Sequence, residues 1–235
     1  MKRVSINSID VGESCRLISK GLSRCGQEDQ KVTSGIKLIV EEQISLGLKT
    51  FPVTWEFDAV RGVSISKDLR HLYVVLSLVR MADAGAVSIA DVGCGKGRYK
   101  NFCNGLGYTY VGYDMEDSKD LKKGDKIDFC VSDISNEEFV PRESNVILLT
   151  EVIEHVVEPV RLLKRLLKLL SRDERLIVTA PYTCREHQAP HYYYNGFHPR
   201  LISEVTRSEG KKIESEVFLE FGANDVFMGF TICPG

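Results

Sequence analysis

Three glycines at alternate positions follow directly on a short apolar run. The segment reads Asp91-Val-Gly93-Cys94-Gly95-Lys-Gly97, and it leads into residues with helical spacing. Glycines between a strand and a helix allow positive φ angles and let a ligand lie against bare backbone. The spacing therefore predicts a tight turn at the end of a strand. Such a turn either binds a ligand closely or serves only to reverse the chain.

The spacing of the glycines indicates which class of ligand such a turn could bind. A phosphate-binding loop of the nucleoside-triphosphatase type needs Gly-Lys followed by Ser or Thr, but Lys96 is followed by Gly97. A dinucleotide-binding turn needs Gly-x-Gly-x-x-Gly, and Arg98 stands where its third glycine would be. A ligand that carries a nucleoside without a pyrophosphate suits Gly93, Gly95 and Gly97 directly.

Acidic residues close the next two apolar runs. Asp114, followed by Met115, lies about twenty residues beyond the turn, where a carboxylate accepts hydrogen bonds from ribose hydroxyls. A helix N-cap suits the same aspartate. Asp133 ends the following run, and Ile134 comes next. We interpret this pair as a carboxylate for an exocyclic amine beside an apolar wall for a purine ring.

Four of the five histidines follow two later apolar runs, in "TEVIEHVVEP" and "APYTCREHQAPHYYYNGFHP". Imidazole changes its charge near neutral pH and is the most frequent general base. We predict that these segments form an acceptor site, with His155 or His187 as the base and His191 in the acceptor pocket. For each histidine taken alone, packing within a polar loop is the competing interpretation.

A metal site is an alternative use of the same segment. Glu151, Glu154 and His155 stand at i, i+3 and i+4, so they share one face if the end of this strand continues as a helix. With a histidine from the later loop they would make two carboxylates and two imidazoles for a divalent cation. The main interpretation uses no metal.

The elements that must position these residues alternate between strand and helix. Short, almost continuously apolar runs separated by helical stretches predict a doubly wound α/β domain with a mostly parallel sheet. Ligands of such sheets bind at the carboxyl ends of the strands. We expect a helical N-terminal extension over residues 1–65 that caps the site, and the main domain over 66–235. The predicted parallel strands lie in "AVSIADVG", "YTYVGYD", "IDFCVSD", "SNVILLTE" and "ERLIVTAPY". After Pro199 we expect a further helix and two strands that pair at one edge of the sheet.

Composition narrows the classes of partner and the compartment. The 235 residues are 43% hydrophobic with a net charge of −2, which predicts one ordinary core and no basic field for nucleic acid, without excluding that partner. The seven cysteines are scattered and never form a CxxC pair, which indicates a reducing compartment, and we expect a cytoplasmic protein. We find neither a signal peptide nor an apolar segment of membrane-spanning length. Composition says nothing of the oligomeric state.

Together the motifs resemble the successive motifs of class I S-adenosylmethionine-dependent methyltransferases, over roughly residues 70–210. The stretches that carry the resemblance are "DVGCGKGRY", "GYDME", "VSDIS", "LLTEVIEHVVEP" and "LIVTAPY". The resemblance implies a seven-stranded sheet with S-adenosylmethionine over its carboxyl edge. It also implies cofactor-binding residues, which are Asp91, Gly93, Cys94, Gly95 and Gly97 for the methionine part, Asp114 and Met115 for the ribose, Asp133 and Ile134 for the adenine, and Thr150 and Glu151 from the fourth strand.

The acceptor is predicted from the histidine-rich loop. "HQAPHYYYNGFHP" is similar to the loop after the fifth strand in methyltransferases that act on sugars and lipid-linked glycans. We predict O-methylation of a small molecule, with a glycan or lipid-linked sugar as the leading candidate. The "EVIEH" segment also resembles the metal-dependent 2′-O-methyltransferases of small-RNA 3′ ends, which is the first alternative. A scaffold that binds the cofactor without turnover is the second.

Overall fold

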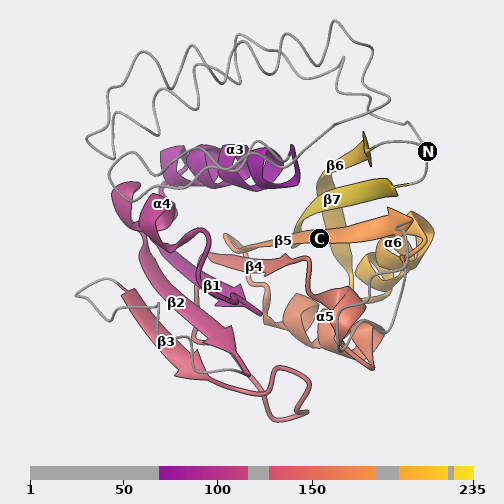
Figure 1. The fold of residues 1–235 in the computed structure, drawn as a ribbon, viewed down its shortest axis with the longest axis horizontal. Helices are drawn as coiled ribbons and strands as arrows, with labels where there is room; N and C mark the ends of the chain where they lie inside the picture. Colours follow the sequence, from indigo (N-terminus) through magenta and orange to yellow (C-terminus); the bar gives the residue numbers. More distant parts are fainter. Residues whose placement is uncertain (1–68, 116–126, 184–195, 222–224) are drawn as a thin grey trace, which may run out of the picture.

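In the part of the chain that the structure describes, seven strands form one sheet in the order β3-β2-β1-β4-β5-β7-β6 (Figure 1). This computed structural model describes residues 69–115, 127–183, 196–221 and 225–235. Strands β1 to β5 are all parallel to one another. β7 runs antiparallel to β5, and β6 runs antiparallel to β7. The strands are β1 (Ser88–Val92), β2 (Thr109–Asp114), β3 (Ile127–Val131), β4 (Val146–Thr150), β5 (Arg175–Thr183), β6 (Lys211–Phe221) and β7 (Asp225–Pro234). The predicted, mostly parallel α/β fold and its paired edge strands are confirmed.

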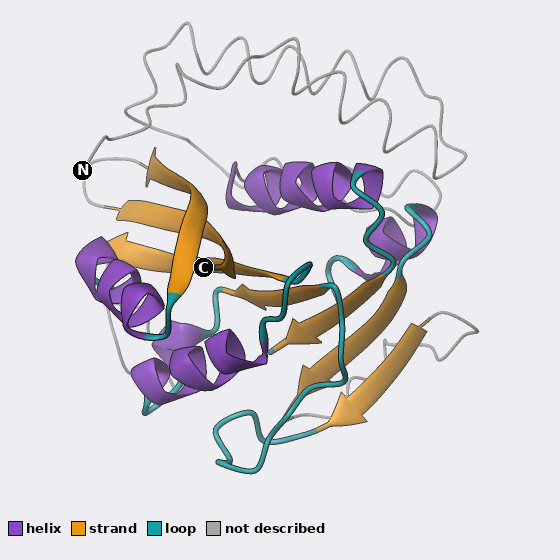
Figure 2. Cartoon of the chain, turned by 180° about the vertical axis from the view of Figure 1, so that it is seen from behind, coloured by secondary structure: helices purple, strands orange, loops and turns teal. Residues whose placement is uncertain are grey.

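Helices cover both faces of this sheet. α3 and α4 lie on one face, and α5 and α6 pack side by side on the other (Figures 1 and 2). The described helices are α3 (Leu69–Asp83), α4 (Lys100–Gly105), α5 (Pro159–Leu169) and α6 (Pro199–Ser208), with a single 3₁₀ turn, η2 (Ile153–His155). None of the helices in the described ranges is long and apolar enough to cross a membrane. The predicted N-terminal extension lies outside the described residues.

Apolar residues at helical spacing explain how α5 and α6 attach to the sheet. Proline occupies the first turn of both helices, where its missing N–H costs no hydrogen bond. The buried face of α5 consists of Leu162, Leu163, Leu166 and Leu167, which join the core beneath β1, β4 and β5. Because helices cover the central strands on both faces, β1 and β4 are buried along nearly their whole length.

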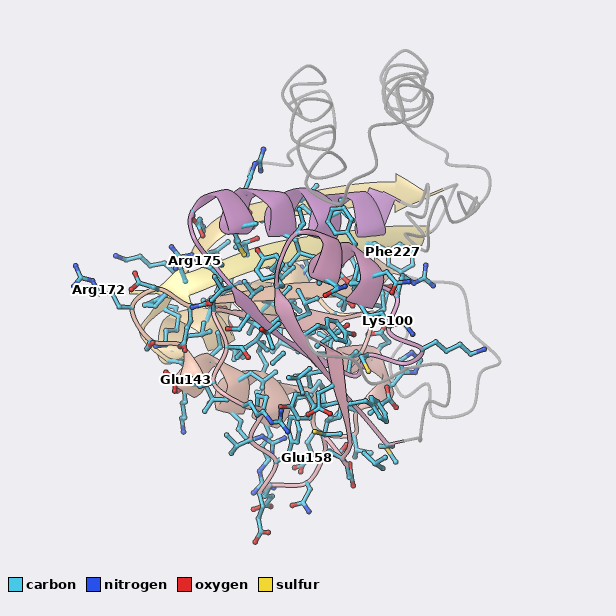
Figure 3. All side chains as sticks on the ribbon, turned by 90° about the vertical axis from the view of Figure 1, so that its left-hand side faces the viewer. Lys100, Glu143, Glu158, Arg172, Arg175 and Phe227 are labelled. Atoms are coloured by element: carbon cyan, nitrogen blue, oxygen red, sulfur yellow. The ribbon has the colours of Figure 1, made fainter. Side chains whose placement is uncertain are left out.

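The parallel register brings the predicted site residues to one edge of the sheet. Asp91 of β1 pairs with Gly112 of β2, and Asp114 at the end of β2 pairs with Val131 of β3. The carboxyl ends of these strands therefore lie together. Lys100, which follows the glycine turn, and Arg175, at the opposite end of the sheet, lie on different sides of the molecule in Figure 3.

Candidate functional site

The turn after β1 is built on three left-handed glycines. The φ angles of Gly93, Gly95 and Gly97 are 74°, 53° and 69°, a conformation that costs residues with a side chain about 1 kcal/mol or more. The N–H groups of Gly93 and Cys94 both donate to the carbonyl of Tyr113, at 2.8 and 3.0 Å. These two bonds tie the turn to β2, so its shape does not depend on a ligand.

Two of these positions require glycine for different reasons. A Cβ on Gly93 would lie 2.5 Å from a methyl carbon of Val152, so this glycine lets the turn pack on the loop after β4. Among the described residues, a Cβ on Gly95 would meet no atom within 4 Å. The space over Gly95 is therefore open, and a ligand can approach its backbone.

Asp91 is buried beneath the turn, with an exposed fraction of 1%. Its Oδ2 accepts a hydrogen bond of 2.6 Å from the hydroxyl of Tyr110, while its buried Oδ1 has no partner in the described residues. Burial raises the pKa of this carboxyl to about 7; the Tyr110 hydrogen bond lowers it and the nearby charge of Asp114 raises it. A buried carboxylate oxygen without a donor fits a ligand that brings a cationic or N–H group.

Asp114, at the carboxyl end of β2, is fixed by the turn itself. Its Oδ2 accepts a 2.8 Å hydrogen bond from the N–H of Gly95. The first two predicted motifs therefore form one unit, in which the glycine turn orients the carboxylate assigned to a ribose. Met115 follows with its side chain largely exposed. Cys94 is buried against Gly112 of β2, and its Sγ donates to the carbonyl of Gly95 at 3.6 Å.

The loop after β3 presents Asp133 and buries Ile134. The exposed Asp133 accepts a 2.8 Å hydrogen bond from the N–H of Ser135 through Oδ1, which closes a tight turn. The side chain of Ile134 belongs to the core cluster with an exposed fraction of 6%. The backbone of Ile134 is thus better placed than its side chain to meet a ring at this edge.

The chain does not continue from β4 as a helix, which was the condition of the metal alternative. Glu151 has a φ of 54°, the only positive value at a non-glycine residue in the described ranges, and its N–H donates to the carbonyl of Thr179 at 3.0 Å. Strain of this kind persists where the surrounding structure enforces it, and it is frequent at functional sites. The half-buried Thr150 precedes it and forms a side-chain hydrogen bond with Tyr99.

The shared face of Glu151, Glu154 and His155 was expected only if a helix continued from β4, and that condition is not met. Only the short η2 turn, Ile153–His155, follows β4, so these residues do not have α-helical spacing. The side chain of Glu154 is buried at 3% exposure, whereas that of His155 is 39% exposed, with its Nε2 4.0 Å from Oε1 of Glu154. Within the described ranges, no three His, Cys, Asp or Glu side chains are arranged to hold a metal ion. His187 and His191 lie outside these ranges.

Three side chains that shape the site were not predicted from the sequence. Tyr110 donates to Asp91, Val152 packs under Gly93, and Tyr99 bonds to Thr150. Tyr110 could have been identified from the sequence, because it stands two residues before Gly112 and therefore lies on the same face of β2. Val152 and Tyr99 lie in apolar or loop positions that a sequence pattern does not distinguish.

Several solved structures have a fold similar to that of this chain. The [4+2]-cyclase SpnF is 12% identical over 84% of this chain and 93% of that one, with a TM-score of 0.57. Magnesium protoporphyrin IX methyltransferase from Synechocystis PCC 6803, with bound S-adenosylmethionine, is 16% identical over 74% and 86%, with a TM-score of 0.52. The mitomycin 7-O-methyltransferase MmcR is 18% identical with a TM-score of 0.50, over 71% of this chain but only 56% of that one. No curated protein matches the chain.

At these identities the structural likeness shows the fold alone, and the family comes from the sequence model. The model described as "Methyltransferase domain" matches residues 75–213, which is more than half of the chain and includes every element from β1 to α6. The chain therefore belongs to the methyltransferase domain family, and its resemblance to the class I S-adenosylmethionine-dependent enzymes is confirmed.

Proposed function

We propose that this protein binds S-adenosylmethionine at the carboxyl edge of its sheet and transfers the methyl group to a hydroxyl of a small molecule. One observation carries the proposal. Beneath an open glycine turn lies a buried carboxylate oxygen of Asp91 without a donor, and the same turn holds Asp114 by a hydrogen bond. This combination fits a ligand with an ammonium group at one end and ribose hydroxyls further along.

Each described residue then has a distinct task. Asp91 and the turn would hold the methionine part, because the buried carboxylate complements a cation and the open backbone at Gly95 admits the chain of the ligand. Asp114 would accept hydrogen bonds from the ribose hydroxyls. Asp133, with the backbone of Ile134, would meet the adenine, and Thr150 and Glu151 would flank the cofactor from the end of β4.

The cofactor supplies an activated methyl group on a sulfonium, which is transferred by in-line displacement and leaves S-adenosylhomocysteine. The chain must align the acceptor with that methyl group and remove the proton of the acceptor hydroxyl. His155 is our candidate for the base, because it is exposed at the relevant edge while the neighbouring Glu154 can stabilise the positive imidazolium. His187 and His191 remain predictions from the sequence for the same acceptor site.

A shallow groove whose lining begins at Val157, two residues after His155, supports a partly apolar acceptor. It has a volume of about 660 Å³ and lies between the first turns of α5 and α6, with mostly apolar lining that includes Val157, Phe197 and Leu201. Arg161 and Lys164 of α5, and Glu158 at the N-cap of this helix, border the groove. A mostly apolar hollow with a few polar groups is typical of small-molecule sites. A sugar carried on a lipid or another apolar group would use both kinds of contact.

Calorimetry with S-adenosylmethionine and S-adenosylhomocysteine tests the cofactor assignment. We expect saturable binding that is indifferent to Mg²⁺ or Mn²⁺. Asp114→Ala should weaken it by at most a few kcal/mol, since charge-assisted hydrogen bonds are lost. Asp173→Ala, an exposed residue at the opposite end of the sheet, is the control. Unchanged affinity in Asp114→Ala would refute the ribose assignment, and no binding at all would refute the cofactor site.

A panel of acceptors tests the reaction. Sugars, lipid-linked sugars, small hydroxyl compounds and a small-RNA duplex are each incubated with the enzyme and S-adenosylmethionine, and released S-adenosylhomocysteine is measured with and without a chelator. Turnover of a sugar or small hydroxyl compound that survives chelation supports the proposal. Turnover of RNA restored only by Mg²⁺ or Mn²⁺ would favour the metal-dependent alternative. Binding without turnover of any acceptor would favour the scaffold.

A further inference from the structure

The guanidinium of Arg165 joins α5 to the loop after β3. Its Nη2 donates to the carbonyl oxygen of Ile134 at 2.6 Å, and its Nη1 donates to that of Asn136 at 2.5 Å. These partners lie 31 and 29 residues earlier in the chain. One side chain therefore holds two backbone groups of a loop that belongs to a different part of the fold.

The carbonyls that Arg165 binds surround the turn of Asp133. The carboxylate of Asp133 caps the N–H of Ser135, and the carbonyl of Asp133 accepts from the N–H of Asn136 at 3.1 Å. These bonds fix the turn internally but do not orient it on the sheet. The bonds from Arg165 contribute that orientation, together with the buried side chain of Ile134 and the N–H of Ser132, which donates to the carbonyl of Asp114 at 2.8 Å.

The rest of the side chain of Arg165 indicates that its charge matters. The guanidinium carbon lies 5.8 Å from the centre of the Phe139 ring, and the buried Nε has no hydrogen-bond partner in the described residues. Desolvating a cation is costly, and two carbonyls alone could be satisfied by neutral donors. Burial, and then the nearby charge of Arg161, lower the pKa of Arg165, and the carboxylates of Glu137 and Asp133 oppose this effect.

Arg161, one turn earlier on α5, provides a contrast. It pairs with the carboxylates of Glu137 and Glu158, and all three side chains are mostly exposed. Exposed ion pairs of this kind contribute little to stability. Arg165 differs because its partners are backbone carbonyls, so it can fix the course of the main chain.

We propose that Arg165 is a positioning residue for purine recognition: from α5 it holds the turn of residues 133–136 so that Asp133 and the backbone of Ile134 meet the adenine of the cofactor. The inference rests on the adenine placement in the proposed function. Arg165 itself acts through the loop. Its bidentate geometry sets the place of the turn, so that the carboxylate of Asp133 is held where it accepts from the exocyclic amine.

The test compares S-adenosylhomocysteine with S-inosylhomocysteine, whose purine lacks the exocyclic amine. Calorimetry gives both affinities for the wild type, Arg165→Met, Arg165→Lys and the control Lys168→Met, an exposed residue on the same helix. We expect Arg165→Met to bind S-adenosylhomocysteine about tenfold more weakly and to lose most of the preference for adenine. Arg165→Lys keeps the positive charge but cannot donate to both carbonyls at once. It should therefore show a preference for adenine between those of the wild type and Arg165→Met.

Hydrogen exchange of the ligand-free proteins provides a readout that does not need the cofactor. Peptides covering residues 133–139 should exchange faster in both Arg165 variants than in the wild type and Lys168→Met. If Arg165→Met does not fold, Arg165→Lys still tests the inference, because it retains a cation at this position. Equal weakening of both ligands with the preference retained would show a merely structural role and overturn the inference. A preference for adenine and an exchange rate in Arg165→Lys equal to those of the wild type would also overturn the inference.

Asp133→Asn separates this inference from the proposed adenine placement. An amide keeps one oxygen for the N–H of Ser135 but loses the carboxylate, so the preference for adenine should fall if the placement is right. A wild type with no preference, or an unchanged preference in Asp133→Asn, would refute the placement itself. A preference that depends on Asp133 but not on Arg165 would refute only the role of Arg165.

Discussion

The hydroxyl of Tyr110 lies 2.6 Å from Oδ2 of Asp91, and both side chains are buried between β1 and β2. This bond satisfies one carboxylate oxygen and leaves Oδ1 for another group. Asp91 also faces Asp114 from β2, and Cys94 and Tyr99 from the turn. Because burial raises the pKa of both Cys94 and Tyr99, these two groups stay neutral when Asp91 titrates. The carboxyl of Asp91 therefore controls the charge beneath the turn.

Cofactor binding should strengthen as the pH rises from 5.5 to 7.5. The pKa of Asp91 is about 7 in the free protein, so at lower pH the carboxyl holds a proton that must leave when a ligand ammonium binds. Calorimetry of S-adenosylhomocysteine in buffers with different ionisation enthalpies measures that proton release. Asp91→Asn should abolish it. Tyr110→Phe removes a donor that lowers this pKa and should move the transition to higher pH. Proton release that persists in Asp91→Asn would contradict this prediction.

Asp91→Asn should also stabilise the ligand-free protein, and more so at high pH. The carboxyl pKa is raised from 3.8 to about 7 on folding, so the charged form opposes folding. That penalty is absent below pH 3.8, grows as the pH rises to about 7 and is constant above it. At about 1.4 kcal/mol for each pKa unit, the gain at pH 8 should exceed that at pH 4 by on the order of 4 kcal/mol. Urea denaturation at the two pH values measures it, and a gain independent of pH would contradict the assignment.

Alanine at Gly93 and at Gly95 should have separate effects. Both substitutions strain a left-handed position by about 1 kcal/mol. At Gly93 the new Cβ also collides with Val152, so Gly93→Ala should destabilise the fold further, by roughly 1–3 kcal/mol. At Gly95 it enters open space, so Gly95→Ala should retain more stability yet lose cofactor affinity. Thermal denaturation and calorimetry distinguish the two.

A double variant provides the control for this comparison. Val152→Ala removes the methyl groups that the Cβ at Gly93 would meet. Gly93→Ala with Val152→Ala should therefore be less destabilised than the sum of the single variants. Strict additivity would mean that the collision is relieved by backbone movement.

The sequence predicted the sheet because parallel strands that are covered on both faces must be apolar along their length. The same pattern placed Asp91, Asp114 and Asp133 at one edge, and the structure places them there. A helix directly after β4, the condition of the metal alternative, does not form, because i, i+3 and i+4 spacing is equally compatible with an irregular turn. The positive φ of Glu151 is incompatible with a helix at this residue, and no sequence pattern predicts such an angle at a glutamate.

Long-range side-chain contacts account for what the sequence did not predict. Arg165 looks like any basic residue on an amphipathic helix, and only the tertiary packing of α5 brings it to the carbonyl of Ile134. Tyr110 has the apolar pattern of its strand, and its bond to Asp91 depends on the register of β1 and β2. Sequence periodicity places residues on faces but does not pair a side chain with a distant backbone group.

Replacement of His155 should separate catalysis from binding. The ring is partly exposed and belongs to a single 3₁₀ turn, so His155→Ala should change the free energy of unfolding by less than about 0.5 kcal/mol. Because the cofactor contacts assigned above do not include it, the affinity for S-adenosylhomocysteine should stay unchanged. Loss of a general base typically slows turnover by about 10²–10⁴-fold.

The rate is measured with the best acceptor from the panel at saturating S-adenosylmethionine, and Lys168→Ala on the exposed face of α5 is the control. Slower turnover by His155→Ala with unchanged cofactor affinity supports the base, since the group that takes the proton is gone. Equal losses of cofactor affinity and turnover would instead show that the imidazole only supports the loop after β4. Full activity would transfer the assignment to the histidines of the segment after β5.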